Sequence, residues 1–124
     1  MLTTPDERHA VLLVDDNASV RELVARLLRS RGYDVIEATS GEEAEVLYGG
    51  REKPITLLVC DVMMLGLSGP ELAKRLTARQ PSLRTLLISG DPTNAPREGE
   101  SATAFLSKPF SSKQLLDRVR TLLS

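Results

Sequence analysis

The feature that most constrains the fold of this chain is a regular alternation between short apolar runs and segments with helical spacing. The apolar runs are short enough for strands and end at polar or turn residues; they cover residues 11–14, 33–38, 55–60, 83–88 and 102–107. Between them, apolar residues recur every three or four positions after helix-capping residues, which are Asn17 or Ser19, Ser40, Ser68, and Ser111 or Ser112. This alternation predicts an α/β domain with helices on both faces of a parallel sheet.

Length and charge limit the number of domains and the classes of partner. The chain has 124 residues, 41% of them hydrophobic, so we expect one domain over residues 10–124 after an N-terminal tail at 1–9. Its 16 basic and 17 acidic residues give a formal charge of -1, which argues against direct nucleic-acid binding through a basic face. No apolar stretch is long enough to span a membrane. The single cysteine, Cys60, excludes an internal disulfide and suits a cytoplasmic location.

Polar side chains follow four of the predicted strands. Asp15 and Asp16 come after the first strand, Asp61 after the third, Ser89 after the fourth and Lys108 after the fifth. The carboxyl ends of parallel strands meet at one edge of a sheet, where open α/β folds bind their ligands. Carboxylates gathered there repel one another, and a bound hard cation usually offsets this repulsion. The expected cation is Mg²⁺, with Mn²⁺ as the alternative. A lysine and a hydroxyl beside them indicate a phosphoryl group.

These residues also carry a family resemblance. The acidic pair in Val14-Asp15-Asp16-Asn17, Asp61 in Cys60-Asp61-Val62, Ser89-Gly90 and Lys108-Pro109 resemble, in order and spacing, the motifs of response-regulator receiver domains. The resemblance runs from about residue 10 to the C-terminus. It implies a flavodoxin-like, doubly wound five-stranded sheet of order 2-1-3-4-5, and a two-component phosphorylation switch in place of an enzyme with a separate substrate.

The resemblance also assigns roles to single residues. Asp61 would accept a phosphoryl group from a histidine kinase or a histidine phosphotransfer protein. Asp16 and Asp61 would bind Mg²⁺ by their side chains, Asp15 would bind it directly or through water, and Met63 would offer its backbone carbonyl. Ser89 and Lys108 would contact the phosphoryl oxygens, Ser89 and Phe105 would act as the switch, and the Lys108-Pro109 bond would be cis. The signal would pass to an output protein or to a fused domain that the sequence does not name.

The chain departs from the family pattern at two places. Leu65 stands where the family often has proline, which should alter the loop after Asp61. The segment from Asp91 to Ser101, where the family places its fourth helix, contains Pro92 and Pro96 and little apolar surface, so we predict that this helix is short or missing. The local sequences around Ser68, Ser89 and Lys108 resemble those of receivers that are part of hybrid histidine kinases. A free-standing response regulator is equally compatible with them.

Other interpretations compete with the receiver. A phosphatase or phosphotransferase of the haloacid dehalogenase type would need a second acid two residues after Asp61, where Met63 stands. A pseudo-receiver that only binds partners would be expected to lack an acid or the lysine, and none is missing. A flavin carrier would need a hydroxyl-rich phosphate loop and an aromatic stacking partner, and the chain has no tryptophan. Each residue also has a purely structural interpretation when it is taken alone. Asp15 and Asp16 are then more typical of a turn or a helix cap, and Ser89 is typical of a turn. Lys108 is typical of a solvated surface and Phe105 of a core.

Overall fold

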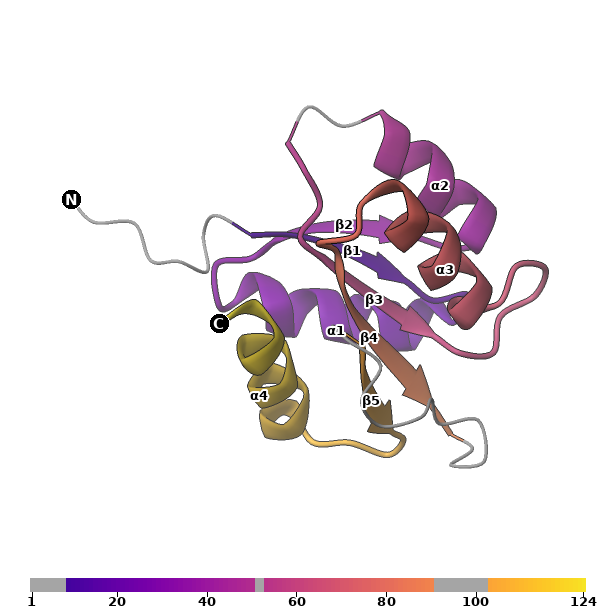
Figure 1. Cartoon of the computed structure of the whole chain (residues 1–124). Coiled ribbons are helices and arrows are strands. Elements are labelled where there is room, and N and C mark those ends of the chain that lie inside the picture. The colour runs from indigo at the N-terminus through magenta and orange to yellow at the C-terminus, as the bar shows by residue number, and fades with distance from the viewer. Residues whose placement is uncertain (1–8, 51–52, 91–102) are drawn as a thin grey trace.

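The structure, a computed structural model, describes residues 9–50, 53–90 and 103–124. Strands and helices alternate along the chain up to β4, as the sequence pattern predicts (Figure 1). The strands are β1 (Ala10–Val14), β2 (Asp34–Ala38), β3 (Leu57–Asp61), β4 (Arg84–Ser89) and β5 (Thr103–Ser107). The helices are α1 (Ala18–Arg29), α2 (Gly41–Gly49), α3 (Gly69–Arg79) and α4 (Ser112–Leu123).

The five strands form one parallel sheet in the order β2-β1-β3-β4-β5, which confirms the predicted order. β1 lies between β2 and β3, and its residue Leu12 pairs with Ile36 on one side and Leu58 on the other. The chain therefore reverses its direction of winding after β2, and the space beyond β1 and β3 is the switch point of the topology. β3, β4 and β5 continue the sheet on that side.

Helices cover both faces of the sheet, as Figure 1 shows. Successive residues of a strand point to opposite faces, so Leu12 packs in the cluster that includes Leu72 of α3, while Leu13 packs in the cluster that includes Val24 of α1. α2 and α3 cover the first face and α1 and α4 the second. The central strands are buried throughout because apolar side chains meet a helix layer on either face.

Side-chain caps fix where the helices begin. The side chain of Asn17 accepts a hydrogen bond from the Val20 amide, and Ser40 accepts one from the Glu43 amide. Ser68 and Ser111 do the same at α3 and α4 within complete capping boxes. Of the caps left open by the sequence, Asn17 and Ser111 are the ones used. Each helix therefore begins directly after the loop that follows a strand.

The predicted strand boundaries were wrong by one or two residues. The third strand begins at Leu57, two residues later than predicted, and Asp61 and Ser89 are the last residues of β3 and β4 instead of the first residues beyond them. The register explains this difference, because Asp61 still pairs with Ile88 and Ser89 with Ser107. The predicted loss of the helix between Asp91 and Ser101 falls outside the described residues and stays a prediction.

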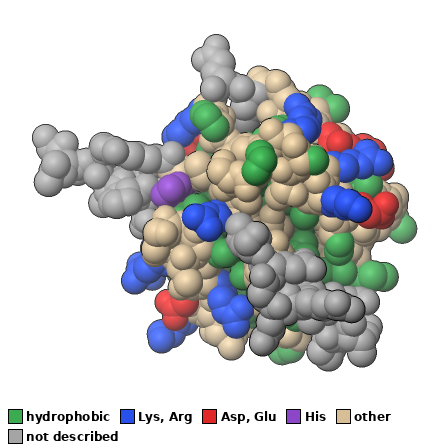
Figure 2. All heavy atoms as spheres, viewed as in Figure 1, with side chains coloured by type: hydrophobic (Ala, Val, Ile, Leu, Met, Phe, Trp, Pro, Cys, Tyr) green, Lys and Arg blue, Asp and Glu red, His purple; other side chains and the backbone are tan. Residues whose placement is uncertain are grey.

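Two surface properties bear on partners. Among the described residues no helix is long and apolar enough to cross a membrane. On the described part of the face in Figure 2, basic and acidic side chains lie next to one another. His9, expected in the tail, is held at the amino end of the sheet, where its Nδ1 lies 3.1 Å from the hydroxyl oxygen of Thr56.

Candidate functional site

The carboxyl ends of β1, β3, β4 and β5 bring the predicted site residues together. Asp15 and Asp16 follow β1, Asp61 ends β3, Ser89 ends β4, and Lys108 follows β5. Backbone hydrogen bonds join these ends, since the Val62 amide donates to the Ile88 carbonyl and the Lys108 amide to the Ser89 carbonyl, both at 2.8 Å. Residues 93 positions apart in the sequence therefore share one edge of the sheet.

Asp61 and Lys108 form a direct ion pair. The Nζ atom of Lys108 lies 2.8 Å from Oδ2 of Asp61, and the Met63 amide donates to Oδ1 at 3.1 Å. The Asp61 side chain is only 9% exposed, whereas that of Lys108 is 31% exposed. The Lys108-Pro109 peptide bond is cis, as the resemblance predicted. Asp61 is thus a nearly buried carboxylate that is paired with the ammonium group of Lys108.

Asp15 is the most buried carboxylate of the site, with 4% of its surface exposed. Its Oδ1 accepts a hydrogen bond from the Asn17 amide at 2.9 Å. Burial raises the pKa of Asp15; the Asn17 hydrogen bond lowers it, and the negative charge of the nearby Asp61 raises it again. The net effect is a raised pKa, because loss of hydration outweighs the one hydrogen bond.

Asp16 is exposed, and its carboxylate contacts the loop between β3 and α3. Its Oδ2 accepts a hydrogen bond from the Leu65 amide at 3.3 Å, which ties the end of β1 to the loop between β3 and α3. In the described part of the chain, no three acidic, histidine or cysteine side chains are grouped so that they could hold a metal ion. The structure therefore brings both Asp61 and Asp16 within electrostatic range of Asp15, while the Asp16 carboxylate accepts its hydrogen bond from the loop.

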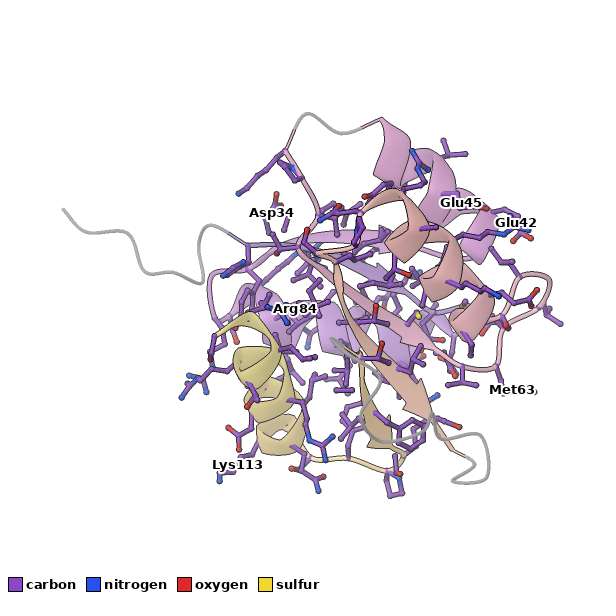
Figure 3. The ribbon with its side chains drawn as sticks, viewed as in Figure 1. Asp34, Glu42, Glu45, Met63, Arg84 and Lys113 are labelled. Atoms are coloured by element: carbon purple, nitrogen blue, oxygen red, sulfur yellow. The ribbon has the colours of Figure 1, made fainter. Side chains whose placement is uncertain are left out.

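The remaining predicted residues flank this pair. Ser89 is fully buried at the end of β4. Phe105 is partly buried and packs against the core cluster beneath α2 and α3. The Met63 side chain is 68% exposed at the start of the loop after β3 (Figure 3), and the Met63 amide donates a hydrogen bond to Asp61. Ser89 thus lies on β4, which pairs with β3, and Phe105 lies on β5, at the far side of β4.

Arg21 is a site residue that the sequence did not single out. Its Nη1 donates to the backbone carbonyl of Asp15 at 2.9 Å, and its Nε lies 3.3 Å from Glu37 on β2. Glu37 also pairs with Arg29 at 3.0 Å. Arg21 thereby joins α1 and β2 to the backbone of the acidic pair. Its position one turn into the helix after Asp15 and Asp16 is the signal that could have indicated this contact.

Comparison with known proteins identifies the family. The family model described as "Response regulator receiver domain" matches residues 11–120. The chain is 39% identical over 116 residues to the sensor kinase CckA of Brucella abortus, and 30% identical over 120 residues to the receiver protein CpdR of the same organism. The chain belongs to the response regulator receiver family.

Solved structures agree with this assignment. The receiver domain of the hybrid histidine kinase CckA superposes with a TM-score of 0.80 at 38% identity, over 93% of this chain and 99% of that one. The response regulator TrrA of Thermotoga maritima, solved with Mg²⁺ and BeF, superposes with a TM-score of 0.80 at 27% identity, over 92% of this chain and 98% of that one. This chain is therefore a receiver domain of two-component signal transduction.

The share of each relative that the receiver domain covers differs greatly. The match takes in 91% of this chain in both Brucella relatives, but 12% of CckA and 95% of CpdR. The receiver domain is thus a small part of one relative and nearly the whole length of the other. The haloacid dehalogenase and flavin-carrier interpretations receive no support, because the family match spans almost the whole domain.

Proposed function

We propose that this receiver domain accepts a phosphoryl group on Asp61 from a phosphohistidine of a histidine kinase or histidine phosphotransfer protein. The observation that carries the proposal is the Lys108–Asp61 ion pair at 2.8 Å, at the end of a buried strand and beside Asp15. A carboxylate oxygen of Asp61 attacks phosphorus, a P–O bond forms as the P–N bond breaks, and the imidazole nitrogen leaves with the electron pair. The domain acts on itself and on no separate substrate.

We further propose that Asp15, Asp16 and Asp61, with the backbone carbonyl of Met63, bind Mg²⁺, with Mn²⁺ as the alternative. The donor set fits, because carboxylate and carbonyl oxygens are the ligands that these cations prefer. The raised pKa of Asp15 fits as well, since burial beside Asp61 places negative charge where a cation would offset it. When bound, the cation would offset negative charge on Asp61 and on the phosphoryl group during transfer.

The side chains on the neighbouring strands complete the proposed switch. Lys108 now pairs with Asp61 and would pair with a phosphoryl oxygen once Asp61 is modified. Ser89 would donate its hydroxyl hydrogen to another phosphoryl oxygen, and Phe105 would change rotamer with it. The altered surface of β5 and its neighbours would then signal to an output protein or a fused domain. We place this exchange in the cytoplasm, with no direct contact to nucleic acid.

Phosphorylation of Asp61 is tested by mass spectrometry after incubation with acetyl phosphate and Mg²⁺. Wild type should gain one phosphoryl group, and Asp61→Asn should gain none because the nucleophile is gone. Asp117→Asn is the matched control, since the Asp117 side chain is 58% exposed on α4 and lies 3.6 Å from Lys113; it should be labelled like wild type. EDTA should abolish labelling. If wild type took up no phosphoryl group, the pseudo-receiver that only binds partners would replace this proposal.

A further inference from the structure

The loop between β3 and α3 is held by carboxylates from two other parts of the chain. The Leu65 amide donates to Oδ2 of Asp16, and the Leu67 amide donates to Oε2 of Glu42 in the first turn of α2, both at 3.3 Å. Figure 3 shows Glu42 on the side of α2 near this loop. Two amides of one short loop thus bind two acids, of which only Asp16 is a proposed metal ligand.

The local backbone brings the two amides of the loop to these acids. Gly66, between the two donors, has a φ of +77°, and a Cβ atom there would lie 3.0 Å from Oε2 of Glu42. A left-handed turn of this kind favours glycine. The Leu65 side chain is 86% exposed and so adds little packing. What residue 65 contributes is its N–H group, which a proline at this position would not have.

The hydrogen bond to Leu65 competes with the use of Asp16 as a ligand. Asp15 and Asp61 each accept a hydrogen bond from the amide two residues ahead, that of Asn17 or Met63, and Asp61 also pairs with Lys108. Asp16 is held by a residue 49 positions away, and the described residues contain no group of three acids placed to bind a metal. Asp16 is also exposed, so its carboxylate can turn between the loop and the other two acids.

We infer that the Leu65 N–H is a latch that holds the Asp16 carboxylate on the β3–α3 loop until a divalent cation draws it toward Asp61. The inference rests on the proposed role of Asp16 as a metal ligand. Its consequence is that this receiver domain binds Mg²⁺ more weakly than the same chain with proline at position 65. The bond is long and exposed, so the expected effect is about two- to fivefold in the dissociation constant.

A hydrogen bond from the Leu65 N–H to Asp16 could instead support Mg²⁺ binding, and a Mg²⁺ titration distinguishes this role from the latch. A ligating carboxylate often keeps a hydrogen bond on its second oxygen, and the donor then supports the metal site. In that case removal of the Leu65 N–H would weaken Mg²⁺ binding. The latch predicts tighter binding, because the cation no longer has to break the bond to the loop.

The test is a Mg²⁺ titration followed by ¹H–¹⁵N NMR on wild type, Leu65→Pro and Leu65→Ala. Leu65→Pro removes the N–H and should bind Mg²⁺ about two- to fivefold more tightly. Leu65→Ala keeps the N–H and removes the exposed side chain, so it should match wild type. Equal or weaker binding by Leu65→Pro, in a protein whose spectrum shows an intact fold, would overturn the latch.

A second measurement needs no substitution and holds even if Leu65→Pro fails to fold. In wild type, the Leu65 amide should exchange faster and move upfield as Mg²⁺ is added, because it loses its acceptor. The Leu67 amide, which donates to Glu42, is the internal control and should change little. A Leu65 amide that stays protected at saturating Mg²⁺ would refute the latch.

Failure of the latch and failure of the metal site give different results. Asp16→Ala should lose most Mg²⁺ affinity if Asp16 is a ligand. If Asp16→Ala bound Mg²⁺ like wild type, the proposed ligand set and the latch would both be wrong. If Asp16→Ala lost affinity while Leu65→Pro did not gain it, the metal site would stand and only the latch would fall.

Discussion

Gly69 is the residue whose substitution should damage the site most directly without touching a charged group. It is the first residue of α3, and its amide donates to the Val62 carbonyl at 3.1 Å. A Cβ atom added at Gly69 would lie 2.2 Å from the carbonyl oxygen of Asp61, 3.0 Å from its carbonyl carbon and 3.1 Å from Cα of Val62. All three atoms belong to the backbone, so no rotamer change can relieve the overlap.

The magnitude follows from the size of this overlap. Ordinary contact begins at 3.4 Å, so the 2.2 Å approach is short by more than 1 Å, and the start of α3 must move away from the end of β3. Overpacking of this kind costs about 1–3 kcal/mol or more, against a gain of up to about 1 kcal/mol from the better helix propensity of alanine. We expect Gly69→Ala to lose about 2 kcal/mol of unfolding free energy.

Urea unfolding followed by circular dichroism measures this change. With an m-value of about 1–3 kcal/mol/M, the midpoint should fall by roughly 0.7–2 M. Gly49→Ala is the matched control, because Gly49 ends α2 and a Cβ there would lie 3.5 Å from Arg79 Nη2, an ordinary contact with the end of a flexible side chain. Its midpoint should stay level or rise slightly. If the Gly69→Ala midpoint matched wild type, the tight contact between α3 and the Asp61 backbone would not constrain the fold.

Two further predictions concern the charges of the site. Because the folded-state pKa of Asp15 is raised above its usual 3.8, ionised Asp15 destabilises the fold once the pH has risen through the folded pKa, and protonation at lower pH restores that stability. In EDTA, Asp15→Asn should therefore have a higher urea midpoint than wild type at pH 7, with a gap that narrows toward pH 4; a constant gap would contradict this. Lys108→Ala should remain able to bind Mg²⁺ but show a smaller amide-shift response to beryllofluoride, while Lys113→Ala, whose side chain is 86% exposed, should respond like wild type. An undiminished response in Lys108→Ala would remove Lys108 from the switch.

The architecture could be predicted because it depends on patterns that the sequence displays directly. The apolar runs identify the strands, and the capping residues Ser40 and Ser68 locate two helix starts to the residue. Parallel winding then places Asp15, Asp61 and Lys108 at one edge. Strand ends could not be predicted to the residue, because Asp61 extends β3 through pairing with a neighbour 27 positions away, Ile88.

The finer contacts of the site could not be predicted, because backbone atoms make them. The Leu65 amide on Asp16 and the Met63 amide on Asp61 are available to any residue type except proline. The sequence named Asp16 as a ligand because of its residue type, but it could not show that the Asp16 carboxylate rests on the loop. The metal ligands, the Ser89 and Phe105 switch and the loss of the helix between Asp91 and Ser101 stay predictions.

The electrostatics of the site explain why Lys108 is the residue through which phosphorylation would be read. Asp61 and Asp15 are both buried at this end of the sheet. The pKa of Asp15 is raised because the residue loses hydration and lies near the negative charge of Asp61. Lys108 offsets part of this charge, with its Nζ 2.8 Å from Asp61. A phosphoryl group on Asp61 would add negative charge farther from the strand, and Lys108 would follow it because the charge-assisted hydrogen bond to a phosphoryl oxygen is strong. The Lys108 amide donates to the Ser89 carbonyl at 2.8 Å. The Lys108 side chain would therefore move while the Lys108 backbone stays hydrogen-bonded to β4. The proposed response therefore begins at β4 and β5, the strands that carry Ser89 and Phe105.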